Sequence, residues 1–309
     1  MSELILNLLP VNEKEKAEFE AAAPGYRHAY AGRRTVTPEQ LAQAEVLFGW
    51  PRPADLEKAV RLKWFQTMWA GADEYAGHVP EGVLLTNSSG SNARSVAEHM
   101  LASTMALCRK LPLYRDHQRD HSWKDEGKMK TLLDSRVLVV GAGHIGAVYA
   151  SLCRAMGAHT IGLTRTPAPV EGFDEVRAMG ELDALLPTAD VVALVEPHSP
   201  STVGLMDGRR LALMKDDAIL ISSGRGTVLD QDGLAEAMGG GKLWGAALDV
   251  TEPEPLPADS PLWEIPNLLI TPHVAGGMRL EITRQECIRM ALENLKRYVN
   301  GEELKNRVR

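Results

Sequence analysis

Three polar segments in the second half of the chain hold side chains that could act together on a carbonyl group: Arg225, Glu254 and His273. Each stands beyond the end of an apolar run that predicts a strand, and doubly wound sheets bind ligands at the carboxyl ends of their strands. A guanidinium that is always charged can anchor a carboxylate and stabilise a developing oxyanion. A histidine held by a carboxylate can donate a proton to that oxygen. These groups suit the reduction of a 2-oxo acid by hydride transfer.

A glycine-rich turn earlier in the chain indicates where a hydride donor would bind. It follows the predicted strand 136–140 and opens a helical run, 147–156. The first glycine permits a tight turn, the second lets the backbone approach a pyrophosphate, and the third lets the helix pack against the strand. The start of the helix adds N–H groups and the positive end of its dipole. In this setting the motif predicts a nicotinamide dinucleotide site that contains Gly141, Gly143, His144, Ile145 and Gly146.

The end of the next predicted strand, 159–163, bears on the choice between NAD and NADP. An acidic residue there would hydrogen-bond the 2′-hydroxyl of NAD, but none occurs before Glu171. Arg165 can instead pair with the 2′-phosphate of NADP, and Thr164 and Thr166 can donate hydrogen bonds to it. The sequence therefore predicts NADP as the preferred cofactor and NAD as the alternative. The competing interpretation of Arg165 is a solvated surface side chain.

These segments resemble the D-isomer-specific 2-hydroxyacid dehydrogenase family, and within it the glyoxylate and hydroxypyruvate reductase branch most. The resemblance covers essentially the whole chain, because further motifs occur in the family's order. They are Asn92-Ala93 with Val96-Ala97-Glu98, Ala189-Asp190-Val191-Val192 with Pro197 and Thr202-Val203-Gly204-Leu205, and Asn294-Leu295 through Gly301 to Asn306-Arg307-Val308. The resemblance implies an enzyme that interconverts a small 2-oxo acid and the D-2-hydroxy acid.

The resemblance also assigns roles to the polar residues. Arg225 resembles the arginine that binds the substrate carboxylate and polarises the 2-oxo group, and His273 resembles the general acid. Glu254 resembles the carboxylate that orients this histidine, whereas Glu252 is expected to be a solvated loop residue. Asp249 resembles the residue that holds the nicotinamide carboxamide. Further cofactor contacts implied in this way are Pro197, Thr202, Ser223, Gly224 and Gly276, and the implied substrate-binding residues besides Arg225 are Trp69, Ala70 and Gly71.

Alternating strand and helix patterns predict an α/β protein, because parallel strands need helical crossovers. Strands are expected at 3–9, 45–50, 62–68, 136–140, 159–163, 190–195, 218–222, 244–248 and 268–271. Helices are expected after a capping box at Thr37–Gln40, from the N-cap Asn92 to Tyr114, and over 281–299. With the resemblance, the expected fold is two doubly wound parallel-sheet domains. A Rossmann-type NAD(P)-binding domain, residues 99–279, is inserted into a flavodoxin-like substrate domain, residues 1–98 plus 280–309.

Composition and charge narrow the range of partners. The 309 residues include 34 Lys and Arg against 41 Asp and Glu, a formal net charge of −7 without a basic stripe, so we expect no nucleic-acid partner. The start of the chain lacks the positive region of a signal peptide. The sequence also contains no run of about 18 apolar residues, which a membrane-spanning helix would need. The three scattered cysteines fit reduced, buried thiols in the cytoplasm. We expect no metal site, because His117 and His121 have zinc-helix spacing but stand among charged residues typical of a solvated face.

The leading hypothesis is a cytoplasmic, NADPH-preferring reductase of glyoxylate, hydroxypyruvate or a similar small acid. By the family's habit it forms a homodimer through the long helix after Asn92. One alternative is a dehydrogenase of another D-2-hydroxy acid, such as phosphoglycerate or an aliphatic or aromatic acid. Another is a non-catalytic nucleotide-sensing scaffold. A sensor, however, needs neither a general acid with its orienting carboxylate nor an arginine that stabilises an oxyanion. The sequence leaves the exact substrate, the direction of the reaction in the cell and the pathway open.

Overall fold

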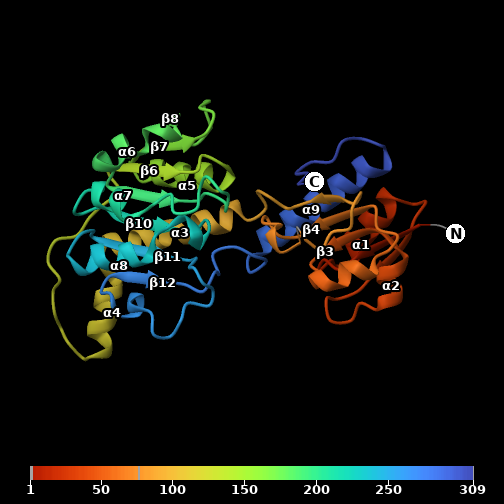
Figure 1. The fold of residues 1–309 in the computed structure, drawn as a ribbon, viewed down its shortest axis with the longest axis horizontal. Coiled ribbons are helices and arrows are strands. Elements are labelled where there is room, and N and C mark those ends of the chain that lie inside the picture. The colour runs from red at the N-terminus through yellow and green to blue at the C-terminus, as the bar shows by residue number, and fades with distance from the viewer. Residues whose placement is uncertain (1–2, 76, 309) are drawn as a thin grey trace. The chain divides into compact units, whose positions relative to one another are not determined.

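The computed structural model of the protein describes residues 3–75 and 77–308. The chain divides into two units, and Figure 1 labels many of their helices and strands. Unit 1 comprises Met1–Asn92 and Gly277–Arg309, and unit 2 comprises Ala93–Gly276. The two ends of the chain therefore build one unit, and the middle builds the other. The boundaries expected from the sequence, 98/99 and 279/280, lie a few residues further along the chain.

Unit 1 contains a five-stranded parallel sheet in the order β2-β1-β3-β4-β5. Its strands are β1 (Leu4–Asn7), β2 (Arg27–Tyr30), β3 (Ala44–Gly49), β4 (Trp64–Thr67) and β5 (Leu84–Thr86). Its helices are α1 (Glu13–Ala22), α2 (Pro38–Gln43) and α9 (Glu281–Val299), with 3₁₀ turns at Pro53–Lys58 and Asp73–Tyr75. This is the flavodoxin-like strand order, in which ligands bind beyond the carboxyl ends of the strands beside the central β1.

Alternate side chains of the unit 1 strands pack on opposite faces of this sheet, as the period of two in a strand requires. Leu6 and Leu47 belong to one core cluster, which also contains Leu41 of α2. Ile5 and Phe48 belong to a second cluster, which is completed by residues of α1 and α9. The sheet is therefore covered on both faces, which explains why its central strands read as continuous apolar runs.

Unit 2 contains a seven-stranded parallel sheet in the order β12-β11-β10-β9-β6-β7-β8. Its strands are β6 (Arg136–Val140), β7 (His159–Thr164), β8 (Glu175–Ala178), β9 (Val191–Leu194), β10 (Ile219–Ser222), β11 (Gly245–Leu248) and β12 (Leu268–Ile270). Its helices are α3 (Ala93–Cys108), α4 (Leu111–Arg119), α5 (His144–Ala155), α6 (Leu182–Leu185), α7 (Gly208–Leu213) and α8 (Gln231–Gly239), with 3₁₀ turns at Met179–Glu181, Leu186–Thr188, Gly226–Val228 and Pro261–Glu264. The order reverses between β6 and β9, which is the switch point of a Rossmann-type sheet.

Two helix predictions are confirmed. Thr37 accepts a hydrogen bond from the Gln40 N–H, and the Gln40 side chain accepts one from the Thr37 N–H at 2.9 Å, so the capping box that opens α2 is complete. The last predicted helix is present as α9 over Glu281–Val299. Local capping signals and a strong apolar period were therefore sufficient at these two places.

The single helix predicted from Asn92 to Tyr114 is wrong. The chain leaves α3 at Cys108, passes through Lys110 with φ 54°, and begins α4 at Leu111. A left-handed residue cannot continue a right-handed helix, and the apolar period did not reveal this break. The predicted N-cap is also wrong, because the side-chain oxygen of Asn92 is buried without a hydrogen-bond partner in the described parts of the chain.

Three strands were not predicted, namely β2, β5 and β8, and all three lie at the edges of their sheets. An edge strand is covered on fewer sides than a central one, so it needs fewer apolar residues. The sequences RHAY in β2 and EVRA in β8 accordingly carry charged residues and show partly exposed side chains. The hydrophobic pattern was therefore too weak to indicate β2 and β8. β5 has the apolar sequence LLT but only three residues, which is too short to show the pattern of a strand.

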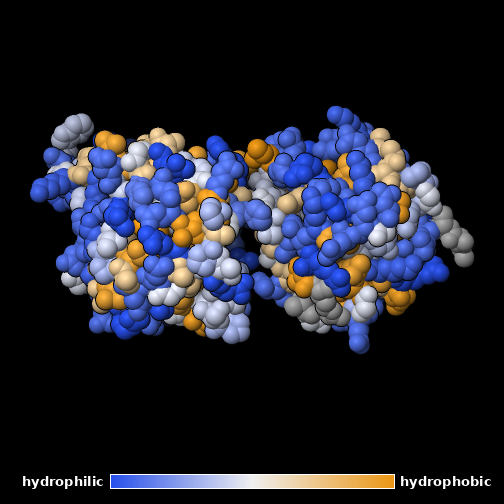
Figure 2. Space-filling view, turned by 90° about the horizontal axis from the view of Figure 1, so that it is seen from above, coloured by the Kyte–Doolittle hydropathy of each residue, from blue (hydrophilic) through white to orange (hydrophobic). Residues whose placement is uncertain are grey.

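The visible surface is mostly hydrophilic, with hydrophobic residues scattered among the charged ones (Figure 2). All three cysteines are buried and unpaired. Within the described residues no helix combines the length and the hydrophobicity that crossing a membrane requires. Groups of three or more metal-ligating side chains are likewise absent from residues 3–75 and 77–308.

Candidate active site

The glycine turn connects β6 to α5 and has a geometry that suits a phosphate group. Gly141 has φ +117°, a conformation that side chains other than glycine rarely adopt. A Cβ atom on Gly146 would lie 2.1 Å from the Gly141 carbonyl oxygen, so only glycine lets α5 begin this close to the turn. Gly143 is the N-cap of α5 and faces open space. The free N–H groups at the start of α5 are thus accessible to a pyrophosphate, with His144 exposed and Ile145 half-buried beside them.

Two charged side chains lie near this turn. β7 ends at Thr164, and the exposed Arg165 and Thr166 follow it. Glu196, after β9, is half-buried, and its Oε1 atom would lie 3.3 Å from a Cβ on Gly141. Burial raises the pKa of Glu196, and the charge of Arg165 opposes that shift. Glu196 was not predicted as a site residue, because one carboxyl group after a strand forms no recognisable motif.

The turn after β9 is held together by Thr202. Its Oγ1 donates to the Pro197 carbonyl oxygen at 2.6 Å and accepts from the Ser199 N–H at 2.8 Å. Thr202 is buried and Pro197 is exposed. The structure therefore brings these two predicted cofactor residues together, with Thr202 shaping the turn that presents Pro197.

Ser223 and Gly224 pack against the same turn from the end of β10. The Ser223 N–H donates to the Leu194 carbonyl oxygen at 3.0 Å. A Cβ on Gly224 would lie 2.4 Å from the Glu196 carbonyl oxygen, so a larger residue would push the two segments apart. Glycine is therefore required at 224 for the chain to reach Arg225 in this position.

The segments of Arg225, Glu254 and His273 follow β10, β11 and β12, which are neighbours in the sheet. Their carboxyl ends therefore lie at one edge. The Arg225 segment passes close to the next one, since a Cβ on Gly226 would lie 2.1 Å from the Thr251 carbonyl oxygen. Arg225 itself is half-buried and donates from Nη1 to the Gly224 carbonyl oxygen at 2.9 Å.

His273 and Glu254 form a direct pair. Nδ1 of His273 lies 2.8 Å from Oε2 of Glu254, and Oε1 of Glu254 accepts from the Thr251 N–H at 3.1 Å. Glu252 does not take this place, although the sequence offered both glutamates. Within the described residues Nε2 of His273 has no hydrogen-bond partner, and the side chain is 47% exposed. The imidazole is thus oriented through one nitrogen and accessible at the other.

Asp249 holds the backbone around His273. Its carboxylate accepts hydrogen bonds from Thr271 Oγ1 at 2.6 Å, from the Val274 N–H at 2.9 Å and from the Ala275 N–H at 3.0 Å. His273 has φ 50°, and its N–H donates to the Asp249 carbonyl oxygen at 2.9 Å. A left-handed residue other than glycine costs about 1–3 kcal/mol, and such strain persists only where the surroundings enforce it. Asp249 provides that enforcement, a role the sequence analysis did not foresee.

Helix α3 adds two contacts to this loop. Ser95 Oγ donates to the Ala275 carbonyl oxygen at 2.6 Å, and His99 Nε2 lies 3.1 Å from Thr271 Oγ1. Ser95 is buried, and His99 also lies 3.8 Å from the Asp249 carboxylate. No spacing rule links residues of α3 to a loop so distant in sequence, so these contacts could be found only from the structure.

Replacing Ser95 by alanine should lower the stability of the protein. The change leaves the buried Ala275 carbonyl oxygen without its side-chain donor, which should cost about 1–3 kcal/mol in the free energy of unfolding. Equilibrium unfolding in urea measures the difference. Ser122→Ala, at an exposed position of the same unit, is the matched control and should unfold like the wild type. Equal unfolding midpoints for Ser95→Ala and wild type would show that the contact is unimportant.

The residues that the sequence assigned to substrate binding, apart from Arg225, lie in unit 1 after β4. The Trp69 and Ala70 carbonyl oxygens accept from Ser88 N–H at 3.0 Å and Asn87 Nδ2 at 2.7 Å, which fixes this loop. Trp69 is half-buried and packs against both core clusters of unit 1. In the described parts of the chain the N–H groups of Ala70 and Gly71 donate to no acceptor. They are therefore available to a ligand, which a substrate-binding loop requires. Gly276, the remaining predicted cofactor residue, is the half-buried last residue of unit 2.

The turn, the switch-point sheet and the polar loops of unit 2 define a dinucleotide-binding oxidoreductase fold. Comparison with known families agrees: residues 101–275 match the model described as "D-isomer specific 2-hydroxyacid dehydrogenase, NAD binding domain". This match covers more than half of the chain. The protein therefore belongs to the family of D-isomer-specific 2-hydroxyacid dehydrogenases, which are NAD(P)-dependent oxidoreductases.

Curated relatives carry several names. Glyoxylate/hydroxypyruvate reductase B of Pectobacterium carotovorum is 31% identical over 276 residues, which cover 86% of this chain and 86% of the relative. D-3-phosphoglycerate dehydrogenase of Mycobacterium bovis is 35% identical over 245 residues. That match covers 77% of this chain but only 46% of the relative, so this chain spans about half the length of the phosphoglycerate dehydrogenase.

Solved structures share the fold over the full length. A D-isomer-specific 2-hydroxyacid dehydrogenase family protein of Aeromonas salmonicida has a TM-score of 0.87 at 31% identity, covering 100% of this chain and 99% of the other. A D-isomer-specific 2-hydroxyacid dehydrogenase of Xanthobacter autotrophicus, solved with NADPH and MES, has a TM-score of 0.81 at 29% identity, covering 100% and 98%. Both are members of the same family.

Proposed function

We propose that this protein reduces a small 2-oxo acid of the glyoxylate or hydroxypyruvate type to the D-2-hydroxy acid, with NADPH as its preferred cofactor. The observation that carries the proposal is the pair of His273 and Glu254, 2.8 Å apart, at the same sheet edge as Arg225. An imidazole, the carboxylate that orients it and a guanidinium at the same sheet edge are the groups that this reduction uses. The similarity to a glyoxylate/hydroxypyruvate reductase supports the choice of substrate class.

In this mechanism each of the three side chains has one task. Arg225 binds the substrate carboxylate and stabilises the negative charge that develops on the 2-oxo oxygen. His273 donates the proton on Nε2 to that oxygen, while Glu254 holds Nδ1 and orients the ring. In unit 1, the N–H groups of Ala70 and Gly71 are proposed to hold the substrate carboxylate as well. The bound reduced nicotinamide supplies the hydride.

The residues around the glycine turn fit a nicotinamide dinucleotide. Gly143 leaves space beside the start of α5, where the pyrophosphate would accept hydrogen bonds from free N–H groups. Asp249 keeps capacity for a further donor, because a carboxylate has about four acceptor sites and three are used here. We propose that this remaining site accepts from the carboxamide, which must approach closely because the Asp249 side chain is only 3% exposed.

The second candidate is the oxidation of D-3-phosphoglycerate, favoured by the similarity to a phosphoglycerate dehydrogenase. The same three side chains would serve it, because both reactions interconvert a 2-oxo acid and a 2-hydroxy acid. A nucleotide-sensing scaffold is the third, and it would need neither His273 nor Glu254. These proposals differ in turnover and in substrate, so they can be separated by one assay.

That assay follows NADPH and NADH oxidation by the purified protein with a panel of 2-oxo acids. The panel contains glyoxylate, hydroxypyruvate, pyruvate, 3-phosphohydroxypyruvate and phenylpyruvate. The highest kcat/KM should occur with glyoxylate or hydroxypyruvate together with NADPH. A higher value with 3-phosphohydroxypyruvate would favour the second candidate, and absence of turnover with every acid would favour the scaffold.

Arg165→Gln should weaken the binding of NADPH and leave that of NADH unchanged. A hydrogen-bonded charge pair contributes about 1.5–3 kcal/mol, which corresponds to a Kd for NADPH roughly 10- to 100-fold higher. Fluorescence titration with both cofactors measures the change, and NADH is the internal control because it lacks the 2′-phosphate. If Arg165 is only a solvated surface residue, the variant will bind both cofactors like the wild type.

Glu196 should make NADPH binding depend on pH. Burial raises its pKa, so the carboxyl group keeps its proton to a higher pH than an ordinary glutamate and loses it as the pH rises further. The new negative charge beside the glycine turn then repels the cofactor phosphates, and the Kd for NADPH should increase. Titrations across this range should show a smaller increase for Glu196→Gln than for the wild type. Parallel curves for the two proteins would exclude Glu196 as the cause.

We also propose that the protein is a cytoplasmic homodimer. Buried, unpaired cysteines suit a reducing compartment. Large apolar side chains are exposed along α4 and the segment that follows it, which suits contact with a second copy. They are Leu111, Trp123, Met129 and Leu133.

A further inference from the structure

A pocket opens in unit 1 at the carboxyl ends of β2 and β3. Its lining comes from two loops, 32–35 after β2 and the start of the loop after β3, at Trp50. β2 and β3 flank β1 in the sheet, so the pocket stands at the switch point of a flavodoxin-like strand order. Ligands of such sheets bind in the crevice at this place. The topology alone therefore makes it a candidate binding site.

Backbone contacts bring the two loops to the end of β1. The Ala31 N–H donates to the Asn7 carbonyl oxygen at 3.1 Å, which holds the first loop beside β1. On the other side Gly49 has φ +117°, and a Cβ there would lie 2.8 Å from the Cβ of Leu8. Glycine is therefore needed for the chain to leave β3 close to β1 and to place Trp50 at the pocket.

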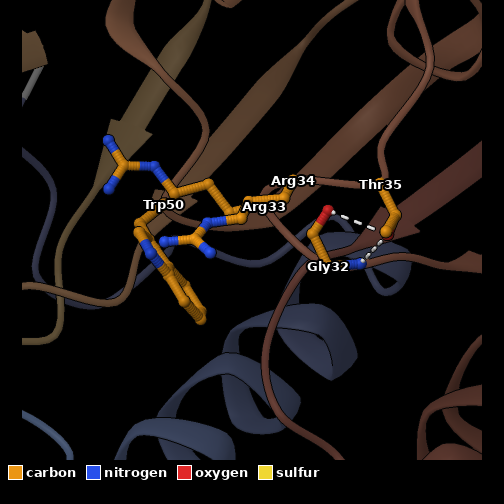
Figure 3. A pocket seen from close by; sticks show the side chains of 5 residues that line it. All are labelled: Gly32, Arg33, Arg34, Thr35 and Trp50. Carbon is orange, nitrogen blue, oxygen red and sulfur yellow. Dashed lines mark hydrogen bonds between the residues drawn. The ribbon is translucent and has the colours of Figure 1, made fainter.

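The pocket has a volume of about 430 Å³ and is lined by Gly32, Arg33, Arg34, Thr35 and Trp50. Small-molecule sites commonly measure about 300–1,000 Å³, so the space suits a small organic molecule. Figure 3 shows both arginine side chains extending to the side on which Trp50 lies, with one guanidinium beside Trp50 and the other pointing away from the indole ring. The pocket thus combines positive charge with one flat apolar wall.

The two guanidinium groups are available for an anion. Across residues 3–75 and 77–308, neither Arg33 nor Arg34 forms an ion pair with a carboxylate, although the chain carries a net charge of −7. Their loop is nonetheless ordered by local hydrogen bonds. The Gly32 N–H donates to Thr35 Oγ1 at 2.9 Å, and the Gly32 carbonyl oxygen accepts from the Thr35 and Val36 N–H groups at 3.0 Å each. The backbone that carries the arginines is therefore held in place before any ligand binds.

Trp50 supplies the second part of the recognition. It is half-buried and packs against the core cluster that contains Phe48 and Trp64, which restrains the side chain. A restrained indole binds flat or apolar groups with little loss of side-chain freedom. Paired arginines bind phosphate groups through several parallel hydrogen bonds.

We propose that this pocket, with Arg33, Arg34 and Trp50, is a binding site of unit 1 for a small phosphate monoester with a flat apolar group. The arginines bind the phosphate, and the apolar group lies against the indole. None of the residues that line the pocket is among those assigned to the 2-oxo acid, although Trp50 and the Trp69 loop follow neighbouring strands, β3 and β4. The proposal does not depend on the proposed reaction. Nucleic acid is a poorer occupant, because two arginines do not form an extended basic surface.

The test is calorimetric titration of the full chain with phenyl phosphate, inorganic phosphate and phenol. Phenyl phosphate should bind saturably and more tightly than either of its parts. The double variant Arg33→Gln/Arg34→Gln should raise its Kd at least about tenfold, the loss expected for removed charge-assisted hydrogen bonds. Trp50→Leu should reduce the advantage of phenyl phosphate over inorganic phosphate. The arginine side chains are exposed, so the double variant should fold like the wild type, which circular dichroism checks.

Two matched variants locate the binding. Arg61→Gln removes an exposed arginine elsewhere in unit 1, and Arg225→Gln removes the arginine assigned to the 2-oxo acid in unit 2. Both should bind phenyl phosphate like the wild type. The proposal is overturned if phenyl phosphate does not bind, if the double variant binds it unchanged, or if either control variant weakens binding as much as the double variant does.

Discussion

His273→Asn and His273→Ala are expected to lower kcat for 2-oxo acid reduction by about 10²–10⁴-fold, the usual contribution of a positioned general acid. The loss should fall on kcat, because the proton is transferred only as charge develops on the substrate oxygen. Asparagine is the sharper substitution, because it tolerates the left-handed backbone at φ 50° better than alanine does. Steady-state kinetics with NADPH and the best acid of the panel measures the change.

Matched variants show whether the loss of kcat comes from the missing proton donor. His121→Ala, at an exposed position of unit 2, should keep wild-type kcat, and both His273 variants should bind NADPH like the wild type. Glu254→Gln should also lower kcat, since it removes the charge behind Nδ1, whereas Glu252→Gln should not. Wild-type kcat in His273→Asn would remove this histidine from the mechanism.

Arg225→Ala is expected to have the second large effect, on both kinetic constants. Loss of one donor to a developing oxyanion typically lowers kcat by about 10²–10³-fold, and loss of the carboxylate contact should raise KM in addition. Arg225→Lys should recover only part of the loss, because an ammonium group keeps the charge but not the planar, paired donors. The kcat and KM values of the two variants, measured separately, distinguish the two contributions.

Arg119→Ala, at an exposed position on α4, is the control for Arg225. It should leave kcat and KM unchanged. If Arg225→Lys were as active as the wild type, paired hydrogen bonds from the guanidinium would be unnecessary. The proposed binding of the substrate carboxylate by these paired hydrogen bonds would then be wrong.

The sequence predicted what depends on local patterns. The strands before Arg225, Glu254 and His273 are apolar runs, and the first two are fully buried. The glycine turn needs its glycines for reasons visible in the motif itself. The choice of Glu254 over Glu252 came from the family resemblance, and the structure places Glu254 against His273. The edge strands and the break at Lys110 lacked such a pattern.

The parts that the sequence did not reveal depend on contacts between distant segments. Ser95 and Ala275 are 180 residues apart, and their hydrogen bond exists only because α3 packs beside the loop of His273. The carboxylate of Asp249 was assigned to the cofactor, but its three hydrogen bonds to the 271–275 loop followed from no motif. Glu196 and the arginine pocket of unit 1 are likewise results of strand order.

The most direct measurement on the central claim is the identity of the product formed by the wild-type protein from hydroxypyruvate and NADPH. Chiral chromatography, with NADPH consumption recorded in parallel, gives both configuration and stoichiometry. We expect one D-glycerate for each NADPH oxidised, and loss of this product in His273→Asn. Formation of L-glycerate, or no reduction of this or any other 2-oxo acid, would contradict it.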